Sequence, residues 1–531
     1  MADAALLQKL DAAELRIGMC DDDKLAKLLE PALPNILGFL AQDSTAVRSK
    51  VMAILGHVNK RVKGNASIAL PLAGLSKLFL TTKNAMISNF ALVYVEMAFA
   101  RTPAADRAAV LPSLLVGIAT RPAPQQDTLL QLLIAALPTL QLPKTVAELR
   151  GATARLPFLE AAADRALVLR HLLDVLLYLP PMTRGQAEGA VPPAPPGLSH
   201  ADAKRVCGKL APEEVRGDLL AAKKQSVLRL LGCSVGTENL FVTAEVLPHW
   251  IVASCDSDGG VAVNGDAEVK RLQKTAVEGV ETIDVITRLV LGGTATTGGG
   301  GGAEQRTAAN IGVRIKAAQT LGRSIAFAGR FPGSLQATFH CLFGADATPK
   351  LMQAGAQLAR HLALHCPQAQ LASLAPPLLA GVLKVLKHEE LPNGLRPDSP
   401  EAVSMRSFGY STLSTLCVRV PQLLKPDLSL VALLFGALPR EDAGARTALQ
   451  EALAALAAVH APPADGGNAT SATSATSATS ATSATSATPP AALQKLRGLL
   501  LDAAAADSPH ARLSAVVWAG RVFPPEDVVA R

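Results

Sequence analysis

The stretch PNILGFLAQDSTAVRSKVMAILGHVNKRVK, residues 34–63, contains two amphipathic segments joined at Asp43-Ser44-Thr45. Apolar residues recur at three- and four-residue spacing on both sides of that joint: Leu33, Ile36, Leu37 and Leu40 before it, and Val47, Val51, Ile54, Leu55 and Val58 after it. This spacing predicts two helices, each with one apolar stripe. Asp43 or Ser44 is placed to accept hydrogen bonds from the free N–H groups that open the second helix.

The same stretch has the pattern of a HEAT repeat, because an apolar helix, Asp43, four spacer positions, Arg48 and a second apolar helix follow one another. One such hairpin cannot bury both of its stripes, so further copies are expected at intervals of roughly forty residues. Pairs of apolar segments do follow, at 68–80 with 84–100 and at 104–119 with 125–140. Further second helices are predicted after 345–350, 398–406, 441–446 and 507–512. The chain is therefore predicted to be all-α, a HEAT- or armadillo-like solenoid of antiparallel helix pairs.

Three tracts of biased composition divide this pattern. We expect a Pro-rich linker at 181–200, a Gly-rich loop at 292–303 and a low-complexity Ala-Thr-Ser linker at 461–490. The interval from Glu441 to Asp507 exceeds one repeat, but it returns to roughly forty residues once the tract 466–490 is removed. HEAT-like repeats are accordingly expected over residues 1–180, 201–291, 304–460 and 491–531.

Composition limits the classes of function. At 531 residues the chain is too long for one ordinary core, and 49% hydrophobic with only 3% aromatic residues suits Ala/Leu-rich helix stacking. The net charge of +7 is small for this length. Proteins that bind single-stranded nucleic acid interleave Lys and Arg with aromatic residues, and this chain has three Tyr and two Trp. We therefore expect no nucleic-acid partner.

The sequence also bears on location. Residues 1–18 carry a charge every few positions, which argues against a signal peptide. The most nearly continuous apolar window, 128–143, is broken by Gln131, Pro138 and Gln141, so it is interpreted as a repeat helix and no membrane insertion is expected. The seven cysteines are scattered without a CxxC pair, as is typical of reduced thiols. We expect a protein of the cytoplasm and nucleus.

No pattern typical of catalysis is present. The sequence contains no GxSxG elbow, Gly-rich dinucleotide loop, HExxH motif or Walker phosphate loop. The densest group of metal-ligand residue types is His340, Cys341, His361, His365 and Cys366, in which the pair His361 and His365 could face one ion from a single helix. The usual zinc-ligand spacings are absent, so these residues are interpreted as core and near-surface side chains. We expect no metal, no cofactor and no enzymatic activity.

The candidate partner-binding residues are Arg48, Lys60, Arg61 and Lys63. The last three close the second helix of the first repeat, where positive charge complements the negative helix end and could also dock an acidic partner. Arg48, like Arg512, could instead form salt bridges or ladders between neighbouring repeats.

Several segments resemble, in the same order, the proteasome adaptor and scaffold family, which consists of large HEAT-repeat proteins. The most specific feature is the Pro-rich insert followed by AKRV, whereas the Gly-rich and Ala-Thr-Ser tracts are not part of the family pattern. The resemblance covers essentially the whole chain and corresponds to the N-terminal region of much longer proteins, so a fragment is expected. The segments are VRSKVMAILGHVNKRVKG (47–64), PAPQQDTLLQLLIAALP (122–138), PPGLSHADAKRV (195–206), FPGSLQATFHCLFG (331–344), ARTALQEALAALA (445–457) and ARLSAVVWAGRVFP (511–524).

The resemblance implies a non-enzymatic adaptor that binds the 26S proteasome through regulatory-cap and core subunits. It further implies that the protein stabilises or quality-checks the association of cap and core. A HEAT-repeat transport carrier or a phosphatase-type scaffold is the main alternative, although carriers tend to be acidic and this chain is not. A hydrolase is a weaker alternative, because its motifs are missing.

Overall fold

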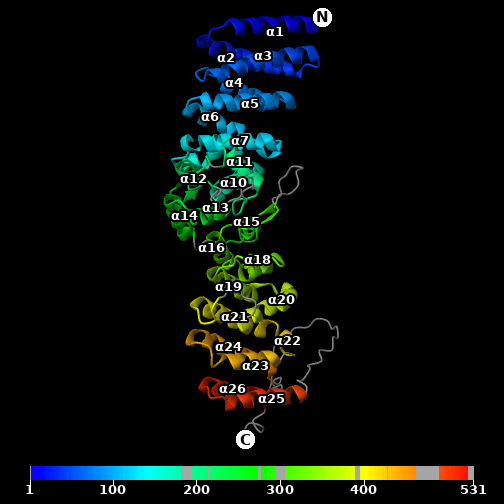
Figure 1. The fold of residues 1–531 in the computed structure, drawn as a ribbon, viewed down its shortest axis with the longest axis vertical. Coiled ribbons are helices and arrows are strands. Elements are labelled where there is room, and N and C mark those ends of the chain that lie inside the picture. Colours follow the sequence, from blue (N-terminus) through cyan, green and yellow to red (C-terminus); the bar gives the residue numbers. More distant parts are fainter. Residues whose placement is uncertain are drawn as a thin grey trace, which may run out of the picture. The chain divides into compact units, whose positions relative to one another are not determined.

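The computed structural model describes residues 2–180, 193–212, 214–272, 277–294, 305–388, 395–426, 428–461 and 490–523. These residues form α-helices that pack as successive antiparallel pairs within each of two units, which confirms the predicted all-α solenoid fold (Figure 1). Unit 1 comprises Met1–Lys274 with Gly293–Thr307, and unit 2 comprises Thr275–Gly292 with Ala308–Arg531. Much of each predicted linker or loop (181–192, 295–304 and 462–489) lies outside the described residues.

Unit 1 contains helices α1 to α14 and two short strand pairs. The antiparallel pairs are β1 (Ser234–Val235) with β2 (Glu238–Asn239) and β3 (Gly293–Thr294) with β4 (Gln305–Arg306), none of which the sequence analysis anticipated. The helices are α1 (Ala2–Met19), α2 (Asp22–Gly38), α3 (Thr45–Gly64), α4 (Leu72–Thr81), α5 (Ala85–Arg101), α6 (Ala104–Leu114), α7 (Ala123–Ala136), α8 (Val146–Arg150), α9 (Ala152–Arg155), α10 (Ala162–Leu177), α11 (His200–Cys207), α12 (Gly217–Leu231), α13 (Thr243–Ala253) and α14 (Gly259–Arg271).

Unit 2 contains the remaining helices. They are α15 (Val280–Leu291), α16 (Ile311–Leu321), α17 (Ile325–Ala328), α18 (Gly333–Phe343), α19 (Pro349–His365), α20 (Gln368–Lys387), α21 (Pro400–Arg419), α22 (Pro421–Leu424), α23 (Leu428–Ala437), α24 (Ala443–His460), α25 (Pro490–Ala505) and α26 (Pro509–Val522). Each unit contains one of the chain's two tryptophans, Trp250 in unit 1 and Trp518 in unit 2, and both are buried.

The first hairpin forms largely as predicted. Both apolar stripes, on α2 with its 3-10 extension and on α3, are buried, including Leu40 and Val51. Ser44 is the N-cap residue of α3, as expected, but its side chain makes no capping hydrogen bond. Instead Arg48 Nη2 donates to the backbone carbonyl of Asp43 over 2.7 Å. Arg48 thus closes the turn by a hydrogen bond to the main chain of Asp43, and not by a salt bridge to its carboxylate.

Two other sequence predictions overestimate helix length. The helix expected over 104–119 ends at Leu114, and Gly117 adopts a left-handed conformation with φ of 71°. Only glycine takes that conformation without steric cost, so the turn depends on it. The window 128–143 is helical only as far as Ala136, where a 3-10 turn, Leu137–Thr139, ends the element at Pro138.

Arginines in the last turns of three helices, α3, α5 and α21, donate hydrogen bonds to carbonyls near the end of an earlier helix. Arg61 at the end of α3 donates to the carbonyls of Ile17 and Cys20 at the end of α1, over 2.6 Å each. Arg101 at the end of α5 donates to the Val62 carbonyl near the end of α3 over 2.9 Å. These bonds satisfy terminal carbonyls that have no partner within their own helix.

Arg419 provides the strongest example in unit 2, since it donates to the carbonyls of Ala363 (2.8 Å), Leu364 (3.1 Å) and Cys366 (2.7 Å) around the end of α19. We expect Arg419→Ala to lower the free energy of unfolding of unit 2 by about 2–3 kcal/mol, since charged donors are lost from partly buried carbonyls. Urea unfolding followed by Trp518 fluorescence in a Trp250→Phe background measures this. Arg512→Ala, at an exposed position of α26, serves as the control and should change it by less than about 0.5 kcal/mol.

Helix α20 is the one described helix whose length and composition would suffice to cross a membrane. It contains Pro376 and Pro377, and its buried side chains include Leu371, Leu374 and Leu378. Core helices of proteins that never meet a bilayer pass the same test, so this helix is weak evidence for a membrane span.

Candidate functional site

The structure separates the four predicted binding residues into two kinds. Arg61 is partly buried, and besides capping α1 it pairs with Asp22, whose pKa is held below its usual value by hydrogen bonds from Arg61 and Asn65. Arg48 is also engaged, through the turn described above. Arg61 therefore ties α3 to α1 and α2, whereas Arg48 closes the turn between α2 and α3.

Lys60 and Lys63 differ from the arginines. Both are exposed near the end of α3, and neither has a partner among the described residues. Gly56 and His57, one turn earlier on the same helix, are exposed as well, and so is Met52. The exposed face of α3 therefore combines two positive charges, which can attract an acidic surface, with the flexible apolar side chain of Met52.

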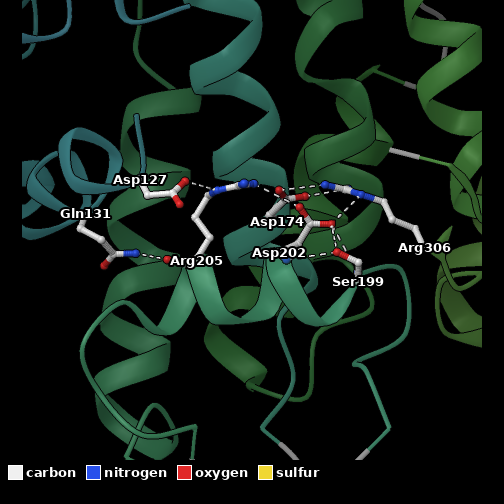
Figure 2. Close-up of polar contacts among 7 residues, drawn as sticks. All are labelled: Asp127, Gln131, Asp174, Ser199, Asp202, Arg205 and Arg306. Atoms are coloured by element: carbon white, nitrogen blue, oxygen red, sulfur yellow. Dashed lines mark hydrogen bonds and ion pairs between the residues drawn. The ribbon is translucent and has the colours of Figure 1, made fainter. Parts of the chain in front are cut away.

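A second group of polar residues lies inside unit 1, where Asp174 and Asp202 are only 1% and 2% exposed. Arg306 on β4 binds Asp174 on α10 with two hydrogen bonds of 2.8 and 3.1 Å, and its Nε lies 2.9 Å from Asp202 on α11. Arg205 on α11 contacts the other Asp202 oxygen over 3.1 Å and reaches Asp127 on α7 over 2.5 Å. Figure 2 shows the two buried carboxylates lying between the two arginines.

Two further residues complete this group, which we call the charge network. Ser199 and Asp202 form a capping box at the start of α11, in which the Ser199 hydroxyl lies 2.8 Å from the Asp202 carboxylate. Gln131 on α7 donates to the backbone carbonyl of Arg205 (Figure 2). The charge network thus fastens α11 and β4, which follow predicted linkers, onto α7 and α10.

Burial and ion pairing shift the pKa values of the network residues in opposite directions. Burial raises the pKa of Asp174, and Arg306 opposes this only in part. Burial also acts to raise the pKa of Asp202, but the charge of Arg306 and the hydrogen bonds from Ser199 outweigh it, so that pKa lies below its usual value. For Arg306, burial acts to lower the pKa and the two carboxylates more than compensate, so the guanidinium stays charged. Each carboxylate already has a guanidinium partner, as expected of a structural clamp.

The His/Cys group singled out in the sequence does not assemble into a ligand set in the described part of the chain. His361 Nε2 lies 2.7 Å from the Ser324 carbonyl oxygen, and its ring contacts that of His365 at 4.6 Å between centroids. Cys341 and Cys366 are buried free thiols, and burial raises the pKa of both. Across the described residues, no group of three or more His, Cys, Asp or Glu side chains could hold a metal ion.

Comparison with known sequences places the chain in a family. A sequence model of the family described as "Proteasome component ECM29, N-terminal" matches residues 10–531. The chain belongs to this family. The human "Proteasome adapter and scaffold protein ECM29" is 29% identical over 481 residues, covering 84% of this chain and 24% of the relative. The Drosophila melanogaster "Proteasome-associated protein ECM29 homolog" is 24% identical over 457 residues, covering 85% of this chain and 22% of the relative.

This member of the ECM29 N-terminal family therefore spans about a quarter of the length of the curated relatives it matches. Among solved structures, importin beta aligns with 97% of this chain and 60% of its own at 12% identity and a TM-score of 0.34. A Kap121p mutant aligns with 99% of this chain and 46% of its own, at 13% identity and a TM-score of 0.32. Sequence identity and structural similarity this low support no inference about the partners of this chain.

The segment 195–206 supported the family resemblance, but no role was predicted for its residues. Three network residues, Ser199, Asp202 and Arg205, lie in that segment. The spacing of Ser199 and Asp202 before a helix is itself a capping-box signal that could have been recognised. Asp174 and Arg306 carried no local signal, since 132 positions separate them.

Proposed function

We propose that this chain is part of a non-enzymatic adaptor that binds the 26S proteasome. The observation that carries the proposal is the family match over residues 10–531, together with relatives named as proteasome adapter or proteasome-associated proteins. Stacked helix pairs expose long ridges on which many weak contacts add up to a stable association. The partners we propose are regulatory-cap and core subunits, whose association the adaptor stabilises or checks in the cytoplasm and nucleus.

Part of the contact surface is the end of α3, where Lys60 and Lys63 are exposed without partners in the described structure. Arg48 and Arg61 are engaged within the chain, so we assign recognition of an acidic partner surface to the two lysines. Such exposed charges contribute modestly to affinity and more strongly to association rate and salt dependence.

The test is affinity capture of the tagged chain from a lysate kept in ATP, followed by mass spectrometry. We expect cap ATPases and core α-subunits to be recovered together. Lys60→Glu/Lys63→Glu should reduce this recovery about tenfold, which corresponds to about 0.7 kcal/mol for each reversed charge. Lys77→Glu/Lys83→Glu is the matched control, because those lysines are also exposed in unit 1 but lie on and after α4.

Three results would count against parts of this proposal. Recovery of neither cap nor core would remove support for proteasome binding by this chain. Recovery of carrier cargoes or of a phosphatase subunit would favour the alternative HEAT-scaffold function. An equal loss in both charge-reversal variants would show that net charge, rather than the end of α3, determines binding.

A further inference from the structure

Unit 2 contains a pocket at the start of α18 that the proposed function does not use. Its volume is about 380 Å³, and it opens between α15, α17 and the turn that leads into α18. The lining residues that matter for its chemistry are Asp284, Thr287, Phe327, Arg330, Phe331 and Ser334. All of them belong to unit 2, so the pocket is a property of that unit alone.

Ser334 is the unusual residue of this pocket. It is 0% exposed, and its hydroxyl has no hydrogen-bond partner among the described residues. The main chain around it is satisfied, because its N–H donates to the Arg330 carbonyl over 3.0 Å and its carbonyl accepts from the Thr338 hydroxyl over 2.9 Å. A buried hydroxyl left without a partner costs about 1–3 kcal/mol, so its position against a cavity points to a missing ligand atom.

Two N-cap serines of unit 2 make a hydrogen bond that Ser334, the second residue of α18, does not make. The Ser324 hydroxyl accepts a hydrogen bond from the Phe327 N–H over 3.1 Å, and the Ser399 hydroxyl accepts one from the Ala402 N–H over 3.2 Å. Each of these hydroxyls caps its own helix. Ser334 follows the N-cap residue Pro332 and lines the pocket, and its hydroxyl has no such bond among the described residues.

The charges around the pocket select for a negatively charged group. The eleven-residue helix α18 begins there, and the start of a helix carries a partial positive charge and N–H donors. Arg330 lies at the pocket and pairs through Nη2 with Asp284, and the two side chains are 38% and 46% exposed. An arginine presents five N–H donors, so this pairing leaves donors for a second acceptor.

We propose that this pocket binds one carboxylate group carried by a partner peptide. The carboxylate accepts hydrogen bonds from Arg330, from the Ser334 hydroxyl and from the start of α18. A carboxylate is preferred over a phosphate, because Asp284 also lines the pocket and repels a dianion more strongly than a monoanion. Phe331 beside the site provides apolar surface for the methylene groups attached to the carboxylate. The proposal stands independently of proteasome binding.

The experiment measures binding to the full 531-residue chain by calorimetry and thermal shift. The probes are N-acetyl-glutamate amide, which carries a side-chain carboxylate, N-acetyl-leucine, which carries a terminal one, and inorganic phosphate. We expect saturable binding of at least one carboxylate probe. The probe that binds more tightly shows whether the partner peptide supplies a side-chain or a terminal carboxylate. Phosphate should bind at least fivefold more weakly.

Variants separate recognition from folding. Arg330→Met should weaken carboxylate binding at least tenfold, and Asp284→Asn should tighten it severalfold because a competing carboxylate is removed. Ser334→Ala should weaken binding yet raise the melting temperature of the free chain, since an unpaired buried hydroxyl is removed. Arg360→Met, which removes an exposed positive charge on α19 away from the pocket lining, is the control and should leave binding unchanged.

Three outcomes would overturn the proposal. The first is the absence of saturable carboxylate binding to both the wild-type chain and Asp284→Asn. The second is tighter binding of phosphate than of either carboxylate probe. The third is a loss of binding in Arg360→Met as large as that in Arg330→Met, which would reveal non-specific attraction to positive charge.

Discussion

Replacement of Arg306 by methionine is expected to lower the free energy of unfolding of unit 1 by about 3–5 kcal/mol. The guanidinium of Arg306 is the common partner of Asp174 and Asp202, which are 1% and 2% exposed. Its removal leaves buried carboxylates without their main source of positive charge, and this costs far more than the net value of the intact pair. Urea unfolding followed by Trp250 fluorescence in a Trp518→Phe background reports on unit 1 alone.

The matched control is Arg150→Met, which breaks another Arg–carboxylate pair in the same unit. Arg150 is 71% exposed where it contacts Glu238, so the expected loss is below about 1 kcal/mol. Equal effects of the two substitutions would contradict the structural role assigned to the charge network. Asp174→Asn combined with Arg306→Met should also cost less than the sum of the single changes, because the two residues act as a pair.

Acidification from pH 7 to pH 5 is expected to destabilise unit 1 by about 2 kcal/mol for each of two buried histidines. Burial, aided by the positive charge of Arg205, lowers the pKa of His171 to about 3, and burial lowers that of His249 to about 4. Since both values lie below the unfolded value of about 6.5, the unfolded chain binds the extra protons. The stabilisation is complete above that value and is lost as the pH falls from it toward the folded values.

His171 provides the sharper test, because neither of its ring nitrogens has a hydrogen-bond partner in the described structure. His171→Leu therefore removes a titrating group without breaking a hydrogen bond. It should reduce the loss of unfolding free energy between pH 7 and pH 5 by about 2 kcal/mol. Met52→Leu, which replaces an exposed residue of α3 that does not titrate, is the control and should leave the pH dependence unchanged. An unaltered pH dependence in His171→Leu would show that this histidine does not carry the effect.

The fold could be predicted because its information is local. The three- and four-residue spacing around Asp43 places Leu40 and Val51 in the core, and the same spacing recurs through the chain. The predicted helix ends were wrong where the backbone preference of a single residue overrides the hydrophobic pattern of its neighbours. Gly117 with its left-handed conformation and Pro138 each end a helix inside an apolar run that a hydrophobic pattern alone would continue.

The candidate sites were harder to predict from the sequence, because they depend on contacts between residues that are far apart along the chain. The lysines at the end of α3 stay a predicted binding site, and nothing in the sequence separates them from Arg61, whose partners lie in α1 and α2. Arg306 and Asp174 are 132 positions apart in the sequence, so no local pattern pairs them. The unpaired hydroxyl of Ser334 is likewise a property of packing, because the sequence around a serine does not show whether its buried hydroxyl finds a partner.

Binding of this chain to the proteasome can be measured with purified components. The 531-residue chain is immobilised, and binding of intact 26S proteasome, isolated core and isolated cap is measured in ATP at several salt concentrations. We expect the intact particle to bind, and we expect this binding to weaken with salt and to weaken further in Lys60→Glu/Lys63→Glu, while Lys77→Glu/Lys83→Glu behaves as wild type. If tryptophan fluorescence shows that the chain is folded and none of the three preparations binds, the proposed function is wrong.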